Sequence, residues 1–125
     1  MTLATYVAIV DDDESLCRSL SRLLLQAGLH SMAFNSAEDF LSSSLHSKFG
    51  CLLVDVQLGG MTGTELHQKL VDKGVRTPVI YITAHDENEE VRPAECAGYF
   101  KKSVDGATLL DAIRRVLPSP IPGNP

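Results

Sequence analysis

The sequence has 125 residues and a formal net charge of −5; 44% of its residues are hydrophobic and 22% are charged. This composition predicts one folded domain with one hydrophobic core, and it excludes a disordered chain. The acidic balance argues against direct binding of nucleic acid, and no apolar run approaches the ~20 residues that span a bilayer.

The first predicted strand and helix lie near the start of the chain. Residues 5–10 form a short apolar run rich in β-branched side chains, which predicts a buried strand. Asp13 has the position of a helix N-cap, and Gly28 that of a helix stop. Between them, apolar residues at helical spacing form one face: Leu16, Leu20, Leu23, Leu24 and Ala27.

Two more strands and a second helix are predicted up to residue 55. Residues 30–34 and 51–55 are short apolar runs that predict strands. Between them, a helix over 36–45 begins at Ser36, three residues before Asp39, in a pattern close to a capping box.

A third helix and a fourth strand follow. Residues 62–65 (TGTE) have the letters of a capping box, and the helix ends at Gly74. Its apolar stripe consists of Leu66, Leu70 and Val71. Residues 77–83 predict a strand with Pro78 at its entry, where a missing N–H is tolerated.

The last part of the chain predicts a fifth strand and a final helix. Residues 84–97 are polar, and Pro93 would break or kink a helix there, so we expect that helix to be short, displaced or absent. Residues 98–100 predict a short strand. Asp105 caps the last helix, and Pro118 stops it. Its apolar face consists of Leu109, Leu110, Ile113, Val116 and Leu117.

Strands thus alternate with helices five times, which predicts an α/β fold with a parallel sheet covered by helices on both faces. In such open sheets the working site lies at the carboxyl ends of the strands. We expect one domain over 1–117 and a proline-rich tail or linker over 118–125.

Charged and hydroxyl residues stand at those strand ends. Asp11 and Asp12 follow the first strand, Asp55 ends the third, Thr83 ends the fourth, and Lys102 lies just past the fifth. Three carboxylates at ~4–5 Å repel by roughly 3–4 kcal/mol per pair at an effective dielectric of ~20, so we expect Lys102 and a divalent cation such as Mg²⁺ to offset the repulsion. A carboxylate beside a metal, an ammonium and a hydroxyl is suited to attack on phosphorus.

Four segments in this order resemble the receiver domain of bacterial two-component response regulators. They are VDDDE, LLVDVQLGGMTGTEL, VIYITAH and GYFKKSVDGATLLDAI, and the resemblance runs from about residue 6 to residue 117. It implies a doubly wound, flavodoxin-like fold with five parallel strands in the order 2-1-3-4-5. It also implies a signalling protein that catalyses only its own aspartyl phosphorylation and dephosphorylation, rather than an enzyme.

By this resemblance, Asp55 accepts a phosphoryl group from a phosphohistidine of a sensor kinase or phosphotransfer protein. Asp11 and Asp12 would hold Mg²⁺, or Mn²⁺, together with Asp55 and the backbone carbonyl of Gln57.

The resemblance assigns further roles at the other strand ends. Lys102 would pair with Asp55 and then with the phosphoryl oxygens, and Thr83 would hydrogen-bond the phosphoryl group. Tyr99 occupies the aromatic switch position that moves together with Thr83. Gln57 and His85 occupy the positions that tune the lifetime of the phosphoryl group.

Two positions depart from the family. The family usually has Lys-Pro with a cis bond after the fifth strand, whereas this chain has Lys102-Ser103, for which we expect a trans bond. Gly59 stands where the family often has proline, so we expect a looser loop after Asp55. With the shortened fourth helix, these departures predict an unusual output surface.

Other functions remain open at this point. The main alternative is a receiver-like interaction module that works without phosphorylation. An aspartate-nucleophile phosphatase would need Thr or Val at the fifth place of DDDES, and a flavin site would place four acids against a phosphate.

The resemblance also implies partners: a C-terminal effector domain in a longer chain, a homodimer on activation, and no nucleic acid or membrane bound by this domain. The N-terminus has no signal-peptide pattern, so we expect a cytoplasmic protein. Widely spaced cysteines argue against zinc or a disulfide framework: Cys17, Cys51 and Cys96. Three histidines lack ligand-like spacing: His30, His46 and His67.

Overall fold

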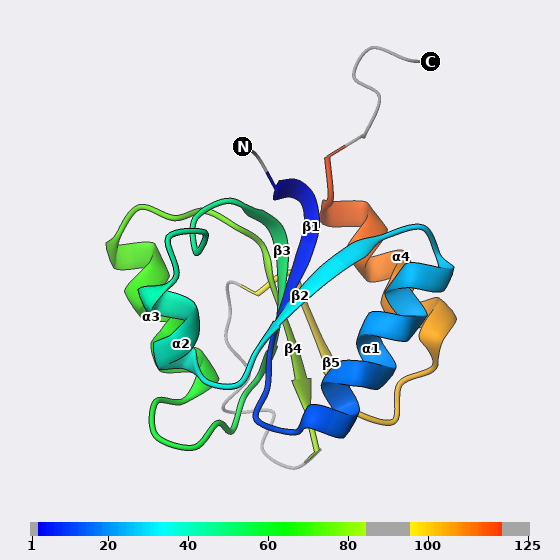
Figure 1. Cartoon of the computed structure of the whole chain (residues 1–125), viewed down its shortest axis with the longest axis horizontal. Helices are drawn as coiled ribbons and strands as arrows, with labels where there is room; N and C mark the ends of the chain where they lie inside the picture. Colours follow the sequence, from blue (N-terminus) through cyan, green and yellow to red (C-terminus); the bar gives the residue numbers. More distant parts are fainter. Residues whose placement is uncertain (1–2, 85–95, 119–125) are drawn as a thin grey trace.

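The computed structural model describes residues 3–84 and 96–118, which form a parallel sheet between two layers of helices (Figure 1). The sheet order is β2-β1-β3-β4-β5, and every neighbouring pair is parallel. The strands are β1 (Leu3–Val10), β2 (His30–Phe34), β3 (Phe49–Asp55), β4 (Val79–Thr83) and β5 (Gly98–Lys101). The predicted fold class and strand order are confirmed.

Four helices are described, and each begins at a side chain that caps it. They are α1 (Glu14–Gln26), α2 (Ala37–Ser42), α3 (Gly63–Asp72) and α4 (Gly106–Val116). Asp13, Ser36, Thr62 and Asp105 each accept a hydrogen bond from a backbone N–H of the first turn. These four caps are the ones that the sequence predicts, because a cap depends on residues only three positions apart.

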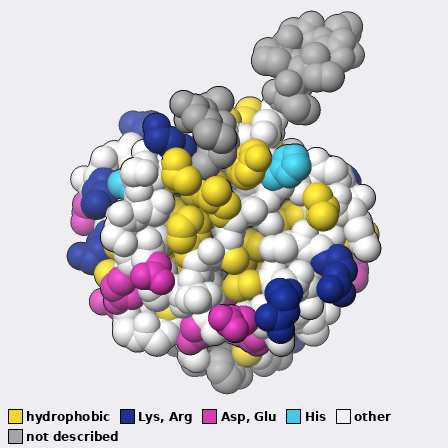
Figure 2. Space-filling model, viewed as in Figure 1, with side chains coloured by type: hydrophobic (Ala, Val, Ile, Leu, Met, Phe, Trp, Pro, Cys, Tyr) yellow, Lys and Arg dark blue, Asp and Glu magenta, His cyan; other side chains and the backbone are white. Residues whose placement is uncertain are grey.

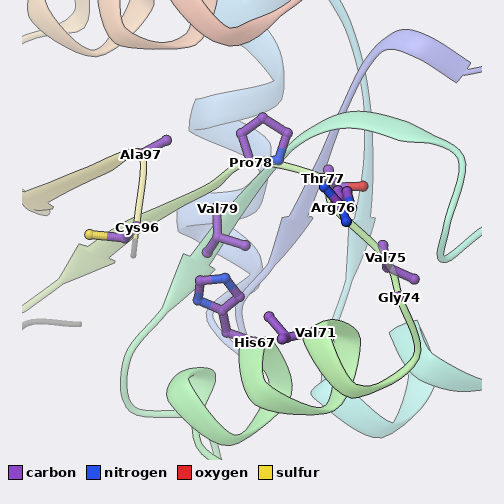
Figure 3. Close-up of a pocket in the computed structure, with 10 residues that line it drawn as sticks. All are labelled: His67, Val71, Gly74, Val75, Arg76, Thr77, Pro78, Val79, Cys96 and Ala97. Carbon is purple, nitrogen blue, oxygen red and sulfur yellow. The ribbon is translucent and has the colours of Figure 1, made fainter. Parts of the chain in front are cut away.

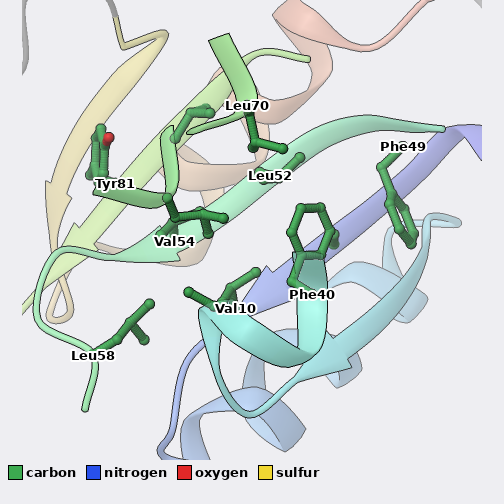
Figure 4. Close-up of a cluster of buried hydrophobic side chains, with 12 residues drawn as sticks. Val10, Phe40, Phe49, Leu52, Val54, Leu58, Leu70 and Tyr81 are labelled. Carbon is green, nitrogen blue, oxygen red and sulfur yellow. The ribbon is translucent and has the colours of Figure 1, made fainter. Parts of the chain in front are cut away.

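The two helix layers bury opposite faces of the same strands. Helices α2 and α3 cover one face, and α1 and α4 cover the other (Figure 1). Because successive strand side chains point to opposite faces, Ala8 and Val10 of β1 join the cluster under α2 and α3, whereas Val7 and Ile9 join the cluster under α1 and α4 (Figure 4). Strand β3 is buried along its whole length, as expected for the centre of a two-sided sheet.

Several element boundaries differ from the prediction. Helix α2 ends at Ser42 instead of continuing to residue 45. On α1, Cys17 is buried whereas Leu16 and Leu23 are only partly buried, so the buried stripe is rotated slightly from the predicted one. The expected short helix within 84–97 falls almost wholly outside the described residues, as do His85 and residues 119–125.

The edge strand β2 and the neighbouring helix α1 leave apolar side chains at the surface. Met32 on this strand is 38% exposed and Leu25 on α1 is 64% exposed. Figure 2 shows hydrophobic side chains gathered at the centre of this face, with acidic side chains below them. None of the described helices is both long enough and apolar enough to cross a membrane.

Close packing between strands requires glycine at position 50. A Cβ atom on Gly50 of β3 would collide with the carbonyl oxygen of Ala4 in β1, and it would lie 2.8 Å from a side-chain carbon of Leu117. The nearer neighbour is backbone, so the strands themselves would have to shift to accommodate the Cβ atom.

We therefore expect Gly50→Ala to lower the free energy of unfolding by about 2 kcal/mol or more, because overpacking forces the strands apart. Chemical denaturation measures this change. Gly59→Ala is the matched control, since its Cβ would approach nothing nearer than a carboxylate oxygen of Asp12 at 3.8 Å. Equal stability of the two variants would contradict the prediction.

Candidate functional site

Two buried carboxylates stand side by side where strands β1 and β3 end. Asp11 directly follows β1, and Asp55 is the last residue of β3. The two strands are paired with Val10 opposite Val54, so both acids emerge at the same edge of the sheet. Asp11 is 2% exposed and Asp55 is 6% exposed. Asp12 lies beside them at the surface, and carboxylate oxygens of all three residues lie within 4.8 Å of one another.

Backbone hydrogen bonds orient the two buried acids in the same way. Asp11 Oδ1 accepts from the backbone N–H of Asp13 at 2.9 Å, and Asp55 Oδ1 accepts from the N–H of Gln57 at 3.0 Å. Each bond closes a short turn onto the next residues of the chain. As a result, the second oxygen of each carboxylate faces the same cation.

That cation is the ammonium group of Lys102. Its Nζ atom lies 3.0 Å from Asp55 Oδ2 and 3.3 Å from Asp11 Oδ2. The backbone N–H of Lys102 donates to the carbonyl oxygen of Thr83 at 2.7 Å, which fixes the start of the lysine next to β4. No described peptide bond is cis, so Lys102-Ser103 is trans as expected, and the lysine still reaches both acids.

Burial and charge act in opposite directions on these groups. Burial raises the pKa of Asp11, and the neighbouring charge of Asp55 raises it further. The hydrogen bond from the backbone N–H of Asp13 and the positive charge of Lys102 lower this pKa, but they offset only part of the rise. Burial acts to lower the pKa of Lys102, but hydrogen bonds and attraction from Asp55 and Asp11 outweigh it, so that its pKa is raised overall. The lysine is therefore charged at neutral pH.

The loop after Asp55 returns closely to the strand end. The N–H of Gly63, the first residue of α3, donates to the carbonyl oxygen of Val56 at 2.9 Å. A Cβ atom on Gly63 would collide with the carbonyl oxygen of Asp55. Glu38 of α2 accepts a long hydrogen bond from the N–H of Met61 at 3.4 Å, which adds a contact from a second helix to this loop.

The remaining predicted residues lie on the same side of the sheet at different depths. Thr83 ends β4 and is 2% exposed, and Gln57 is exposed beside the acids. Tyr99 is partly buried in β5, opposite Tyr81 and two positions before the partner of Thr83. The structure therefore brings Asp11, Asp12, Asp55 and Lys102 into one cluster.

The sequence did not identify one polar pair near this site. The hydroxyl of Tyr81 in β4 lies 3.0 Å from Nδ1 of His67 in α3. The sequence signal for this pair is the tyrosine at the centre of VIYIT, a buried strand in which an aliphatic residue would be expected. Its partner was not predictable, because α3 and β4 meet only in the folded chain.

A separate hollow of about 530 Å³ lies away from the acids, between α3, the start of β4 and residues 96–97 (Figure 3). His67 and Val79 lie together on its wall, and Cys96 lies at its far side. Among the described residues, no carboxylate lines this hollow. The acidic edge is thus the candidate functional site.

The chain is similar to a family of known proteins. The model of the response regulator receiver domain family matches residues 7–114. The chain is 32% identical over 117 residues to the transcriptional regulatory protein TdiR of Thauera aromatica, covering 91% of this chain and 52% of that protein. It is 35% identical over 114 residues to the response regulator protein TmoT of Ectopseudomonas mendocina, covering 89% and 52%. The chain therefore spans about half the length of these relatives.

Solved structures show the same fold. The crystal structure of FixJ-N superposes with a TM-score of 0.81 at 29% identity, covering 93% of this chain and 95% of that one. The response regulator receiver protein from Burkholderia phymatum gives a TM-score of 0.77 at 31% identity, covering 93% and 98%.

The raised pKa of Asp11 predicts a cost in stability. Its contribution favours folding below the ordinary value of 3.8 and is lost as the pH rises through the higher folded-state pKa. We expect Asp11→Asn to be more stable than the wild type at neutral pH in EDTA, and its advantage to shrink as the pH falls toward 3.8. Urea denaturation across this range measures the difference. Asp111→Asn, at an exposed position of α4, is the control; an equal gain there would contradict the assignment to Asp11.

Proposed function

The chain belongs to the response regulator receiver domain family, and we propose that its acidic edge accepts a phosphoryl group on Asp55. The donor is a phosphohistidine of a sensor histidine kinase or phosphotransfer protein. The observation that supports this most directly is the ammonium group of Lys102, 3.0 Å from Asp55 and 3.3 Å from Asp11. One ammonium between two buried carboxylates supplies the charge that a phosphoryl group requires beside an aspartate.

The donor set fits Mg²⁺ or Mn²⁺. Three carboxylates offer oxygen atoms within 4.8 Å of one another, and hard divalent cations prefer oxygen ligands. Asp11, Asp12 and Asp55 would hold the ion, together with the backbone carbonyl of Gln57. When bound, the cation supplies positive charge that neutralises the carboxylates and the phosphoryl oxygens.

The residues of the chain then have distinct tasks. An oxygen of Asp55 forms a bond to phosphorus while the phosphorus–nitrogen bond of the donor breaks, and the electron pair of that bond leaves with the histidine ring. Lys102 pairs with the transferred group, and the hydroxyl of Thr83 hydrogen-bonds one of its oxygens. Tyr99 changes position together with Thr83, while Gln57 and His85 set the lifetime of the acyl phosphate.

A receiver-like interaction module that works without phosphorylation is the second candidate. The departures at Ser103 and Gly59 favour it, since the family usually has proline at the first of these positions and often at the second. Against it, the trans bond at Ser103 leaves Lys102 within reach of both buried acids.

The longer relatives suggest a role for this receiver in a larger protein. Because the chain spans about half of TdiR and TmoT, we infer that it controls a C-terminal effector region. We also propose that it forms a homodimer on activation. We propose the cytoplasm as the location of this activity.

Intact-mass measurement after incubation with acetyl phosphate tests the proposal. We expect one phosphoryl adduct that requires Mg²⁺ and is lost in EDTA and in Asp55→Asn. Lys102→Met is expected to slow adduct formation by about tenfold or more, because it removes a charge beside the reacting oxygen.

Asp111→Asn should react like the wild type, since it removes an exposed carboxylate on α4. A folded wild-type chain that forms no adduct with either acetyl phosphate or a phosphorylated histidine kinase would favour the phosphorylation-independent module. An adduct that persists in Asp55→Asn would show that another residue accepts the phosphoryl group.

A further inference from the structure

Tyr81 carries a hydroxyl group into the fully buried interior of the sheet. The residue is 0% exposed, and its ring packs in the cluster under α2 and α3 (Figure 4). Burying a hydroxyl costs free energy unless it is hydrogen-bonded, so phenylalanine would satisfy the packing at lower cost. Burial also raises the pKa of Tyr81 well above its ordinary value, with a smaller effect from Cys96, so the hydroxyl keeps its proton at any ordinary pH.

The hydroxyl bridges two places on α3. It lies 3.0 Å from Nδ1 of His67, and it donates to the carbonyl oxygen of Gly63 at 3.5 Å. A hydroxyl has one proton, so it donates to Gly63 when Nδ1 of His67 carries a hydrogen, and to Nδ1 when it does not. In both cases His67 and Gly63 hold the hydroxyl between two points of α3.

Gly63, whose carbonyl oxygen accepts from Tyr81, also packs against the acidic site. The glycine packs against the backbone of Asp55 so closely that a Cβ atom would collide with the Asp55 carbonyl oxygen. Its N–H also holds the carbonyl oxygen of Val56 at 2.9 Å. A shift in the loop after Asp55 must therefore displace Gly63, and with it the carbonyl that Tyr81 contacts.

On its other side, Tyr81 contacts Tyr99, one of the two aromatic residues of β5. Tyr81 and Tyr99 are register partners on adjacent strands, and their ring centroids lie 6.2 Å apart at an interplanar angle of 47°. This separation is within the range of aromatic pairs that interact directly. One side chain thus touches both the turn behind Asp55 and Tyr99.

We propose that Tyr81, oriented by His67, is a positioning residue that couples the loop after Asp55 to the ring of Tyr99. The inference rests on the proposed function, in which Asp55 gains a phosphoryl group. It adds a second connection to Tyr99 that runs through the interior, from the acceptor strand through α3 to β4 and β5.

Fluorine NMR of the chain labelled with fluorotyrosine tests the coupling. The sequence has three tyrosines, so each resonance is assigned from the one missing in Tyr6→Phe, Tyr81→Phe or Tyr99→Phe. Beryllium fluoride with Mg²⁺ serves as the phosphoryl mimic, and the shift of the Tyr99 resonance on saturation is the readout. We expect Tyr81→Phe to bind the mimic but to lose about half or more of that shift.

Tyr6→Phe is the matched control, because it removes a hydroxyl from a partly buried tyrosine on β1 that stacks on His30. It should retain the full Tyr99 shift. If Tyr81→Phe does not fold, His67→Ala provides the same test, since it removes the shorter of the two contacts that hold the hydroxyl against α3; it too should reduce the shift.

The outcomes separate this inference from the proposed function. A full Tyr99 shift in folded Tyr81→Phe, or in His67→Ala, would overturn the coupling even if the melting temperature has fallen, because the hydroxyl would then serve stability alone. A wild-type chain that forms the adduct without any Tyr99 shift would overturn the coupling and leave Asp55 as the acceptor. A wild-type chain that neither forms the adduct nor binds the mimic would overturn both.

Discussion

The repulsion between Asp11 and Asp55 is the constraint on which the rest of this site depends. The two carboxylates are almost completely buried at the ends of adjacent strands, and Asp12 adds a third carboxylate within 4.8 Å. At such separations each ionised pair costs roughly 3–4 kcal/mol at an effective dielectric of ~20. Within residues 3–84 and 96–118, the ammonium group that pairs with Asp11 and Asp55 is that of Lys102. Three ionised carboxylates and this one lysine together carry two net negative charges. An edge built in this way favours the binding of further positive charge.

The topology of the sheet produces this crowding and also allows one lysine to relieve it. Because β1 and β3 are neighbours, their last residues are brought together although they are distant in sequence. Lys102 comes from beyond β5, so its side chain must extend past the end of β4 to reach Asp55. A lysine suits this position, since its charge lies at the end of a long flexible stem. The bond from its backbone to Thr83 fixes where that stem begins.

The sequence predicts the local features of this fold better than the contacts between elements. Each N-cap was predictable, because Asp13 or Thr62 needs only a backbone group three residues away. The gathering of Asp11, Asp55 and Lys102 was also predictable, since parallel strands bring their carboxyl ends to one edge. The early end of α2 at Ser42 was not, because nothing in the letters of 36–45 marks that residue as a stop. The bond between His67 and Tyr81 was missed because it depends on how α3 lies against β4.

The buried polar groups of the described residues lie where the proposed coupling begins. Among the described residues, the buried polar or charged side chains are Asp11, Asp55 and Thr83, all at the carboxyl ends of strands. The hydroxyl of Tyr81 lies two residues before Thr83, so it is the first polar group encountered on going inward along β4. Apolar contacts around it have no directional preference, whereas a hydrogen bond requires its partners within a narrow range of distance and angle. In the proposed coupling, the hydroxyl of Tyr81 therefore adds a directional contact to α3 that an aliphatic side chain at the same place would lack.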